Sequence, residues 1–120
     1  MSVAQVTIRL TSETKAAFER YCDDLGFGSS EVLRLLIARE YMIRRLEKLK
    51  EAGTAPRKAR QPHGAAVRLP KITAHFSSAE QVERFDAYAT RCNLNRDAAG
   101  AWLVGKELND SWLRRALSWE

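Results

Sequence analysis

The chain has no long apolar run and no segment that resembles a secretion signal. None of its 120 residues lie in a stretch that approaches the roughly eighteen apolar residues of a membrane helix. Residues 1–10 lack both the basic and the apolar region of a signal peptide. We therefore expect neither insertion into a membrane nor secretion. The hydrophobic content of 45% and charged content of 29% are those of a globular domain.

Cysteine is scarce, and its placement argues against disulfides and metal sites. Cys22 and Cys92 both lie in helical patterns, where reduced, buried thiols are expected. Together with His63 and His75 they do not match the spacing of a zinc motif. No acid/base pair or nucleophile constellation is present either. We expect a protein that is not an enzyme and that needs no cofactor or metal.

Proline is confined to one segment, which also carries most of the excess positive charge. All three prolines lie in residues 53–70, "GTAPRKARQPHGAAVRLP". Residues 51–70 hold four bases and one acid, whereas residues 1–50 hold nine and seven, and residues 71–120 hold seven of each. This composition predicts a basic linker over residues 53–70. The net charge of +5 favours an acidic partner, and nucleic acid before a membrane surface.

Two short segments on either side of this linker have the alternating pattern of half-buried strands. "QVTIRL" at residues 5–10 and "KITAHF" at residues 71–76 each place apolar side chains on one face and polar side chains on the other. An isolated strand leaves its backbone groups unpaired, so each segment needs a partner. The two segments are predicted to pair antiparallel within one chain.

The sequence after each strand repeats. "FERYCDDLGFGSSEVLRLLIARE" at residues 18–40 aligns without a gap with "FDAYATRCNLNRDAAGAWLVGKE" at residues 85–107. Aromatic, apolar and acidic positions match, and such internal repetition determines the fold class. The prediction is a first strand-helix-helix repeat in residues 1–52, the linker at 53–70, and a second repeat with a C-terminal extension in residues 71–120. The two repeats are expected to form one structural unit.

Capping residues delimit the predicted helices. Thr11 is expected to cap the first helix, and Gly26 to end it in the left-handed conformation. In the second repeat Asn93 is expected to take the place of Gly26, while Asn95 and Asp97 supply the cap and the first-turn acid of the last long helix. The helix from Gly28 is expected to continue to Lys50.

Aromatic and apolar side chains are assigned to the core or to an added helix. Phe18 and Tyr21, matched by Phe85 and Tyr88, should lie in a shared core, and Trp102 should lie there too. A short extra helix is expected near the C-terminus. Asn109 or Asp110 would cap it, and one face would carry Trp112, Leu113, Ala116 and Leu117.

This arrangement resembles the ribbon-helix-helix family, also called the MetJ/Arc family, over residues 5–42 and more loosely over 71–108. The resemblance implies a mainly α fold in which an antiparallel two-stranded ribbon lies over four helices. Its outer face would enter the DNA major groove. "QVTIR" keeps the first and third reading positions of a Gln-x-Asn-x-Arg pattern and has Thr7 in place of Asn. A tandem repeat in one chain, forming an intramolecular pseudo-dimer, is similar to the TraY conjugation accessory proteins and the T-DNA-processing accessory proteins.

The outward residues have the chemistry that base recognition needs. Arginine can donate two bonds to guanine and glutamine can pair with adenine, while helix starts offer backbone N–H groups to phosphates. The predicted base-reading residues are Gln5, Thr7, Arg9, Lys71, Thr73 and His75. The predicted phosphate contacts are Gly28, Ser29, Ser30, Asn95 and Arg96, with Arg57, Lys58 and Arg60 of the linker.

Three functions stay open at this stage. The favoured one is a sequence-specific double-stranded DNA-binding protein of the bacterial cytoplasm, associated with the nucleoid or a plasmid. It would repress transcription or assist DNA processing in conjugation. An antitoxin-type module and a protein-interaction module in which one repeat does not read DNA are the alternatives. Self-association on DNA, and a relaxase or toxin partner, are compatible with these interpretations.

Overall fold

Two strands far apart in the sequence pair into an antiparallel ribbon. The computed structural model describes residues 4–53 and 70–118. Strand β1 (Gln5–Arg9) pairs with β2 (Lys71–His75), and Thr7 lies opposite Thr73 at the centre. Backbone hydrogen bonds from Leu10 N to Pro70 O (3.0 Å) and from Phe76 N to Ala4 O (2.8 Å) extend the pairing at both ends. The predicted antiparallel ribbon is confirmed.

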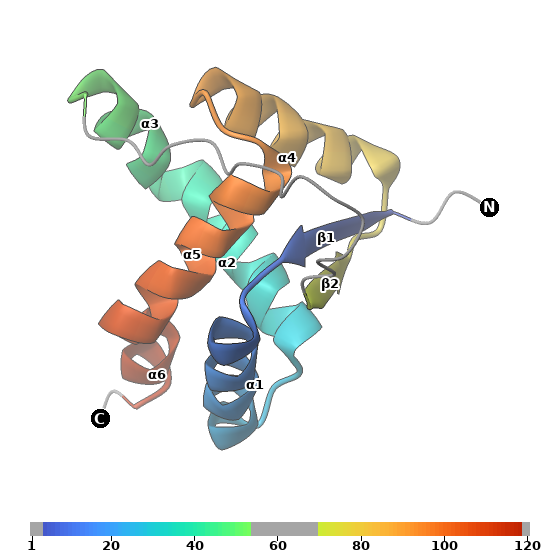
Figure 1. The fold of residues 1–120 in the computed structure, drawn as a ribbon, viewed down its shortest axis with the longest axis vertical. Coiled ribbons are helices and arrows are strands. Elements are labelled where there is room, and N and C mark those ends of the chain that lie inside the picture. Colours follow the sequence, from blue (N-terminus) through green and yellow to red (C-terminus); the bar gives the residue numbers. More distant parts are fainter. Residues whose placement is uncertain (1–3, 54–69, 119–120) are drawn as a thin grey trace.

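Each strand is followed by three helices, so the protein is mainly helical (Figure 1). The helices are α1 (Ser12–Leu25), α2 (Ser29–Ile43), α3 (Arg45–Glu51), α4 (Ala79–Arg91), α5 (Arg96–Asp110) and α6 (Trp112–Leu117). None of the helices within residues 4–53 and 70–118 combines the length and apolarity that crossing a bilayer requires.

The predicted caps of the longer helices are confirmed. Thr11 Oγ1 accepts a hydrogen bond from Thr14 N at 3.1 Å, and Asn95 Oδ1 accepts one from Ala98 N at 2.8 Å. Gly26 (φ 82°) and Asn93 (φ 61°) have the left-handed backbone that was expected after α1 and α4. Asparagine tolerates this region better than most residues because its short side chain can form local hydrogen bonds.

The second helix of each half is interrupted, which corrects the sequence prediction. The helix expected to reach Lys50 ends at Ile43, where Arg44 (φ 50°) turns the chain into the separate helix α3. Ser111 (φ 52°) makes the matching break before α6. Asn109 and Asp110, expected to cap that last helix, lie inside α5 instead.

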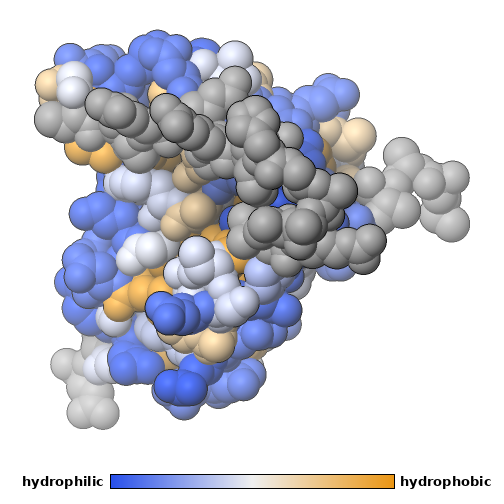
Figure 2. Space-filling view, in the orientation of Figure 1, coloured by the Kyte–Doolittle hydropathy of each residue, from blue (hydrophilic) through white to orange (hydrophobic). Residues whose placement is uncertain are grey.

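The apolar inner face of the ribbon packs on α2 and α5, and these helices form the centre of the core. Helix α2 contacts β2, α5 contacts β1, and the two helices contact each other (Figure 1). Val6, Ile8, Ile72 and Ala74 are buried beneath the ribbon. On the face of the molecule seen in Figure 2, the residues that are not drawn in grey are mainly hydrophilic.

The predicted aromatic core is largely confirmed. Phe18 and Phe85 are fully buried, and the thiols of Cys22 and Cys92 are buried and free. Trp102, expected in the core, is only partly buried and lies with its ring 5.0 Å from the Arg45 guanidinium. In α6 only Leu113 is buried, whereas Leu117 is 52% exposed, so the apolar face predicted there is smaller than expected.

One buried tyrosine–glutamate pair joins α1 to α5. The Tyr21 hydroxyl donates a hydrogen bond to Glu107 Oε2 at 2.5 Å. The same carboxylate oxygen accepts from Leu113 N at 2.7 Å, and the Tyr21 oxygen accepts from Arg114 N at 3.2 Å. Burial and the bond to Glu107 raise the pKa of Tyr21 to about 12. Glu107 is 2% exposed, so these donors satisfy a carboxylate that water cannot reach.

A second pair of the same kind joins α4 to α2. The Tyr88 hydroxyl donates to Glu40 Oε2 at 2.7 Å, Leu46 N donates to the same oxygen at 2.8 Å, and Glu47 N donates to the Tyr88 oxygen at 3.3 Å. Burial, and to a smaller extent the bond to Glu40, raises the pKa of Tyr88. In each pair the carboxylate accepts a hydrogen bond from one backbone N–H in the first turn after the helix break, and the tyrosine oxygen accepts from the next. The break therefore depends on a buried acid and on a tyrosine from the other half of the chain.

Candidate nucleic-acid interface

The outer face of the ribbon presents the six predicted base-reading side chains in three facing pairs. Alternation along both strands turns one face inward and the other outward. The pairs are Gln5 with His75, Thr7 with Thr73, and Arg9 with Lys71. The pairs at the two ends of the ribbon are exposed, and the central Thr7–Thr73 pair is half-buried. The structure therefore brings all six residues onto one surface.

The two ends of the ribbon differ in chemistry. At the centre, Thr7 Oγ1 and Thr73 Oγ1 lie 2.9 Å apart in a hydrogen bond. At one end Gln5 Nε2 lies 3.4 Å from His75 Nδ1. At the other end Arg9 and Lys71 place two basic side chains opposite each other. We call these the Gln5–His75 end and the Arg9–Lys71 end.

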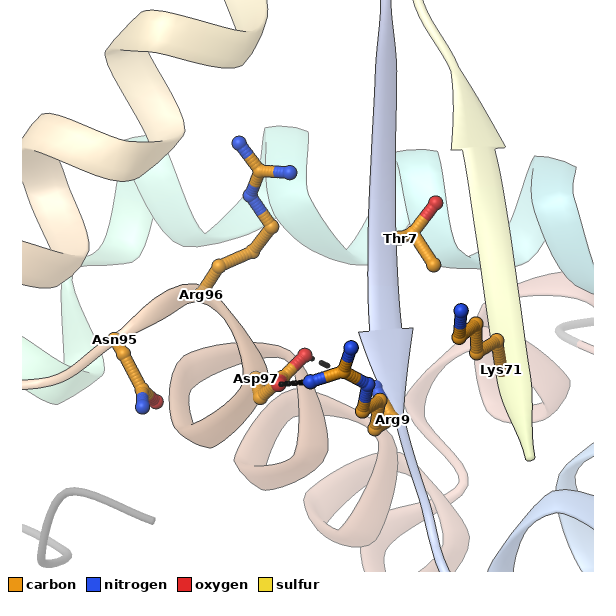
Figure 3. A pocket seen from close by; sticks show the side chains of 6 residues that line it. All are labelled: Thr7, Arg9, Lys71, Asn95, Arg96 and Asp97. Carbon is orange, nitrogen blue, oxygen red and sulfur yellow. Dashed lines mark hydrogen bonds and ion pairs between the residues drawn. The ribbon is translucent and has the colours of Figure 1, made fainter. Parts of the chain in front are cut away.

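A groove of about 470 Å³ lies beside the Arg9–Lys71 end, between the ribbon and the start of α5 (Figure 3). It is lined by Thr7, Arg9, Lys71, Asn95, Arg96 and Asp97. Five of these residues were predicted as DNA contacts, three on the ribbon and two at the start of α5. The fold thus brings residues from three separate parts of the sequence, β1, β2 and the start of α5, into one polar groove.

Asp97 is the lining residue that the sequence analysis did not assign to DNA binding. Its Oδ1 accepts a hydrogen bond from Arg9 N at 3.0 Å, and its Oδ2 lies 3.8 Å from Arg9 Nη1 (Figure 3). The Arg9 side chain is 46% exposed and that of Asp97 is 25% exposed. The contact spans 88 residues of sequence, and no local pattern indicates it.

Arg96 is engaged elsewhere. Its guanidinium donates two hydrogen bonds to Asp86 of α4, with Nε to Oδ1 at 2.8 Å and Nη2 to Oδ2 at 2.6 Å. The pair with Asp86 raises the pKa of Arg96. In Figure 3 the Arg96 side chain extends away from Arg9 and Asp97. A phosphate contact by Arg96 would have to share or replace this bidentate pair.

The remaining predicted phosphate contacts divide into three groups. Gly28 is the N-cap of α2 and brings no capping side chain, and Ser29 and Ser30 are partly exposed in its first turn. At the start of α5 the Asn95 side chain is the cap itself. The predicted linker contacts lie outside the described residues, namely Arg57, Lys58 and Arg60. The two helix starts therefore differ, since a base and an acid follow Asn95 but not Gly28.

The two glutamates buried in the core were not predicted from the sequence either. Glu40 and Glu107 occupy matched positions in the two aligned segments, so the repetition itself was a usable signal. Within the described part of the chain, no group of three or more His, Cys, Asp or Glu side chains is placed to hold a metal ion.

Comparisons with known proteins give no relative from which a function could be transferred. A scan against protein-family models matched no family, and searches of curated proteins and of solved structures found no match.

Proposed function

We propose that this chain is a sequence-specific double-stranded DNA-binding protein of ribbon-helix-helix type. Its ribbon enters the major groove, and its two repeats form a pseudo-dimer within one chain. The observation that carries the proposal is the antiparallel ribbon with Gln5, Thr7, Arg9 and their partners in register on the open face. A two-stranded ribbon fits the width of the major groove, where base edges are distinguishable.

The charges on this face suit DNA. Arg9 offers a planar fork of donors for guanine O6 and N7, and Lys71 supplies a second cation opposite it. The net charge of +5 favours approach to a polyanion. Phosphate contacts from the start of α2 and from the basic linker would position the ribbon, while the strand residues specify the site.

The pseudo-dimer part of the proposal rests on matched interactions. Tyr21 and Tyr88 occupy equivalent repeat positions, and each hydroxyl bonds to the glutamate of the other half. Arg44 and Ser111 break the chain at equivalent positions with nearly the same φ. A two-fold interface produces such reciprocal contacts: a residue of the first half contacts a given position in the second half, and the equivalent residue of the second half contacts the equivalent position in the first.

Repression of transcription and preparation of a conjugative transfer origin both use binding of this kind. Either role would place the protein on bacterial chromosomal or plasmid DNA. A footprint on DNA that flanks its own gene distinguishes the two roles. Protection at the promoter indicates a repressor, and protection beside a nicking site indicates a transfer protein.

The proposed binding is tested by selecting duplexes from a random library and measuring Kd on a selected and a random duplex at one salt concentration. The parent protein should prefer the selected duplex by about 10³-fold or more. Arg9→Ala should weaken binding to it by about 1–3 kcal/mol and to random DNA by much less. Arg115→Ala in α6 removes the same charge away from the ribbon and is the control. Equal affinity of the parent for both duplexes would refute sequence-specific binding.

A further inference from the structure

An acid lies among the basic residues at the Arg9–Lys71 end. Asp97 shares the groove with Arg9, Lys71 and Arg96, and Arg96 is bound to Asp86. A negative charge in a surface that binds DNA weakens its attraction for phosphates. The placement of Asp97 beside the strongest candidate for a base contact therefore requires a reason.

Helix stability alone does not explain the placement. An acid in the first turn of a helix interacts favourably with the helix dipole. Glu13, Glu31 and Glu80 hold that position in α1, α2 and α4. In residues 4–53 and 70–118, however, Asp97 is the first-turn acid whose carboxylate is bonded to a strand of the ribbon.

The opposite end of the ribbon has no counterpart to this pair. In the aligned repeats, Ser30 corresponds to Asp97 and His75 corresponds to Arg9. A serine hydroxyl carries no negative charge, so Ser30 cannot form the ion pair that Asp97 forms with Arg9. The interaction is thus a feature of one half of the interface.

We propose that Asp97 is a positioning residue for base recognition, which orients the Arg9 guanidinium before DNA arrives. The inference rests on the proposed function. Fixing an arginine side chain reduces its conformational entropy, and a side chain that is already ordered loses less on binding. One nitrogen, Nη1, faces Asp97, so other N–H donors of the fork stay available for guanine O6 and N7. The exposure of Arg9 keeps these donors accessible to a base edge.

The test uses Asp97→Asn, which keeps an oxygen to accept from Arg9 N but removes the charge. Asp24→Asn is the matched control, because Asp24 forms an exposed ion pair with Arg114 at 3.6 Å, at the end of α1 away from the ribbon. Both variants gain one unit of net charge. We expect Asp97→Asn to weaken binding to the selected duplex by about tenfold, which is about 1.4 kcal/mol. Its binding to random DNA should be unchanged or tighter, and Asp24→Asn should shift both affinities equally.

A second comparison separates positioning from simple repulsion. In an Arg9→Ala background, Asp97→Asn should no longer change the ratio of the two affinities, because the group that it orients is absent. Equal tightening on both duplexes, or the same loss of ratio with and without Arg9, would overturn the inference. A parent protein that shows no preference refutes the proposed function and the inference together. A parent with a preference that Asp97→Asn preserves refutes the inference alone.

Discussion

The Tyr21 hydroxyl bonds to Glu107 at 2.5 Å, although 86 residues separate them in the sequence. Tyr88 bonds to Glu40 in the same way across 48 residues. Each pair connects a helix of one half to a helix of the other, and each glutamate also caps a short helix. The two halves are therefore joined by buried, directional bonds as well as by apolar packing. Such bonds favour one arrangement of the halves, because a displaced tyrosine leaves a buried carboxylate short of a donor.

Removal of either tyrosine hydroxyl should destabilise the fold. Tyr21→Phe and Tyr88→Phe should each lower the free energy of unfolding by about 1.5–3 kcal/mol, the range for hydrogen bonds to charged groups. Urea denaturation measures the change. Tyr41→Phe is the control, because that hydroxyl donates at 3.5 Å to Gln81 O near the surface and should contribute less than about 1 kcal/mol. Equal small losses in all three variants would contradict the assigned role of the pairs.

Stability should fall at alkaline pH. Burial raises the pKa of Tyr21 and of Tyr41 from 10.0 to about 12, and that of Cys22 from 9.0 to about 12. The folded state keeps these protons over a range in which the unfolded state releases them, so the free energy of unfolding decreases as pH rises. The urea midpoint should be level below about pH 9 and fall toward pH 12. Tyr21→Phe should make that fall shallower, and an unchanged slope would contradict the contribution of Tyr21.

Two glycines of α5 should respond in opposite ways to alanine. A Cβ on Gly100 would lie 2.3 Å from Ile8 Cγ2, whereas a Cβ on Gly105 would meet nothing within 4 Å. Ile8 is fully buried on β1, so Gly100→Ala must displace the Ile8 side chain or the strand that carries it and should cost about 1–3 kcal/mol. Gly105→Ala should instead stabilise the helix by about 0.5–1 kcal/mol. Thermal melts of both variants check the pair, and a stabilised Gly100→Ala would show that β1 does not pack closely on α5.

The parts of the fold that could be predicted are those determined by residues close together in the sequence. Alternation identified both strands and their outward side chains, and cap residues such as Thr11 and Asn95 identified helix starts. The break at Arg44 was missed because the bonds that stabilise it link Glu40 of α2 to Leu46 N and to Tyr88 of α4, and Tyr88 is far away in the sequence.

The candidate site likewise has a part that the local sequence pattern predicted and a part that only the packed structure shows. The period of a strand was enough to place Gln5, Thr7 and Arg9 on one face. It could not indicate that Asp97 holds Arg9 or that Asp86 holds Arg96, because these pairs form only when the helices pack. The assignment of Arg9 to base recognition stays a prediction, and the structure adds a second residue through which to test it.

The last prediction concerns the polarity of the DNA target. The Arg9–Lys71 end carries two cations and the Gln5–His75 end carries the amide and imidazole, so the two ends should read unlike half-sites. The selected duplex should be asymmetric, with a guanine at the Arg9–Lys71 end. Replacement of that guanine by 7-deazaguanine, which lacks the N7 acceptor, should weaken binding by about 1–3 kcal/mol. The same replacement in the other half-site should have a smaller effect.

Symmetrised duplexes complete this test. A palindrome of either half-site mismatches one end of the ribbon, so each should bind more weakly than the asymmetric site, by about 1–3 kcal/mol per mismatched pair. His75→Arg places a guanidinium at the position equivalent to Arg9. This variant should therefore gain affinity for the palindrome of the half-site that Arg9 reads, and not for the palindrome of the other half-site. If both palindromes bind the parent as tightly as the asymmetric duplex does, the difference between the two ends does not govern recognition.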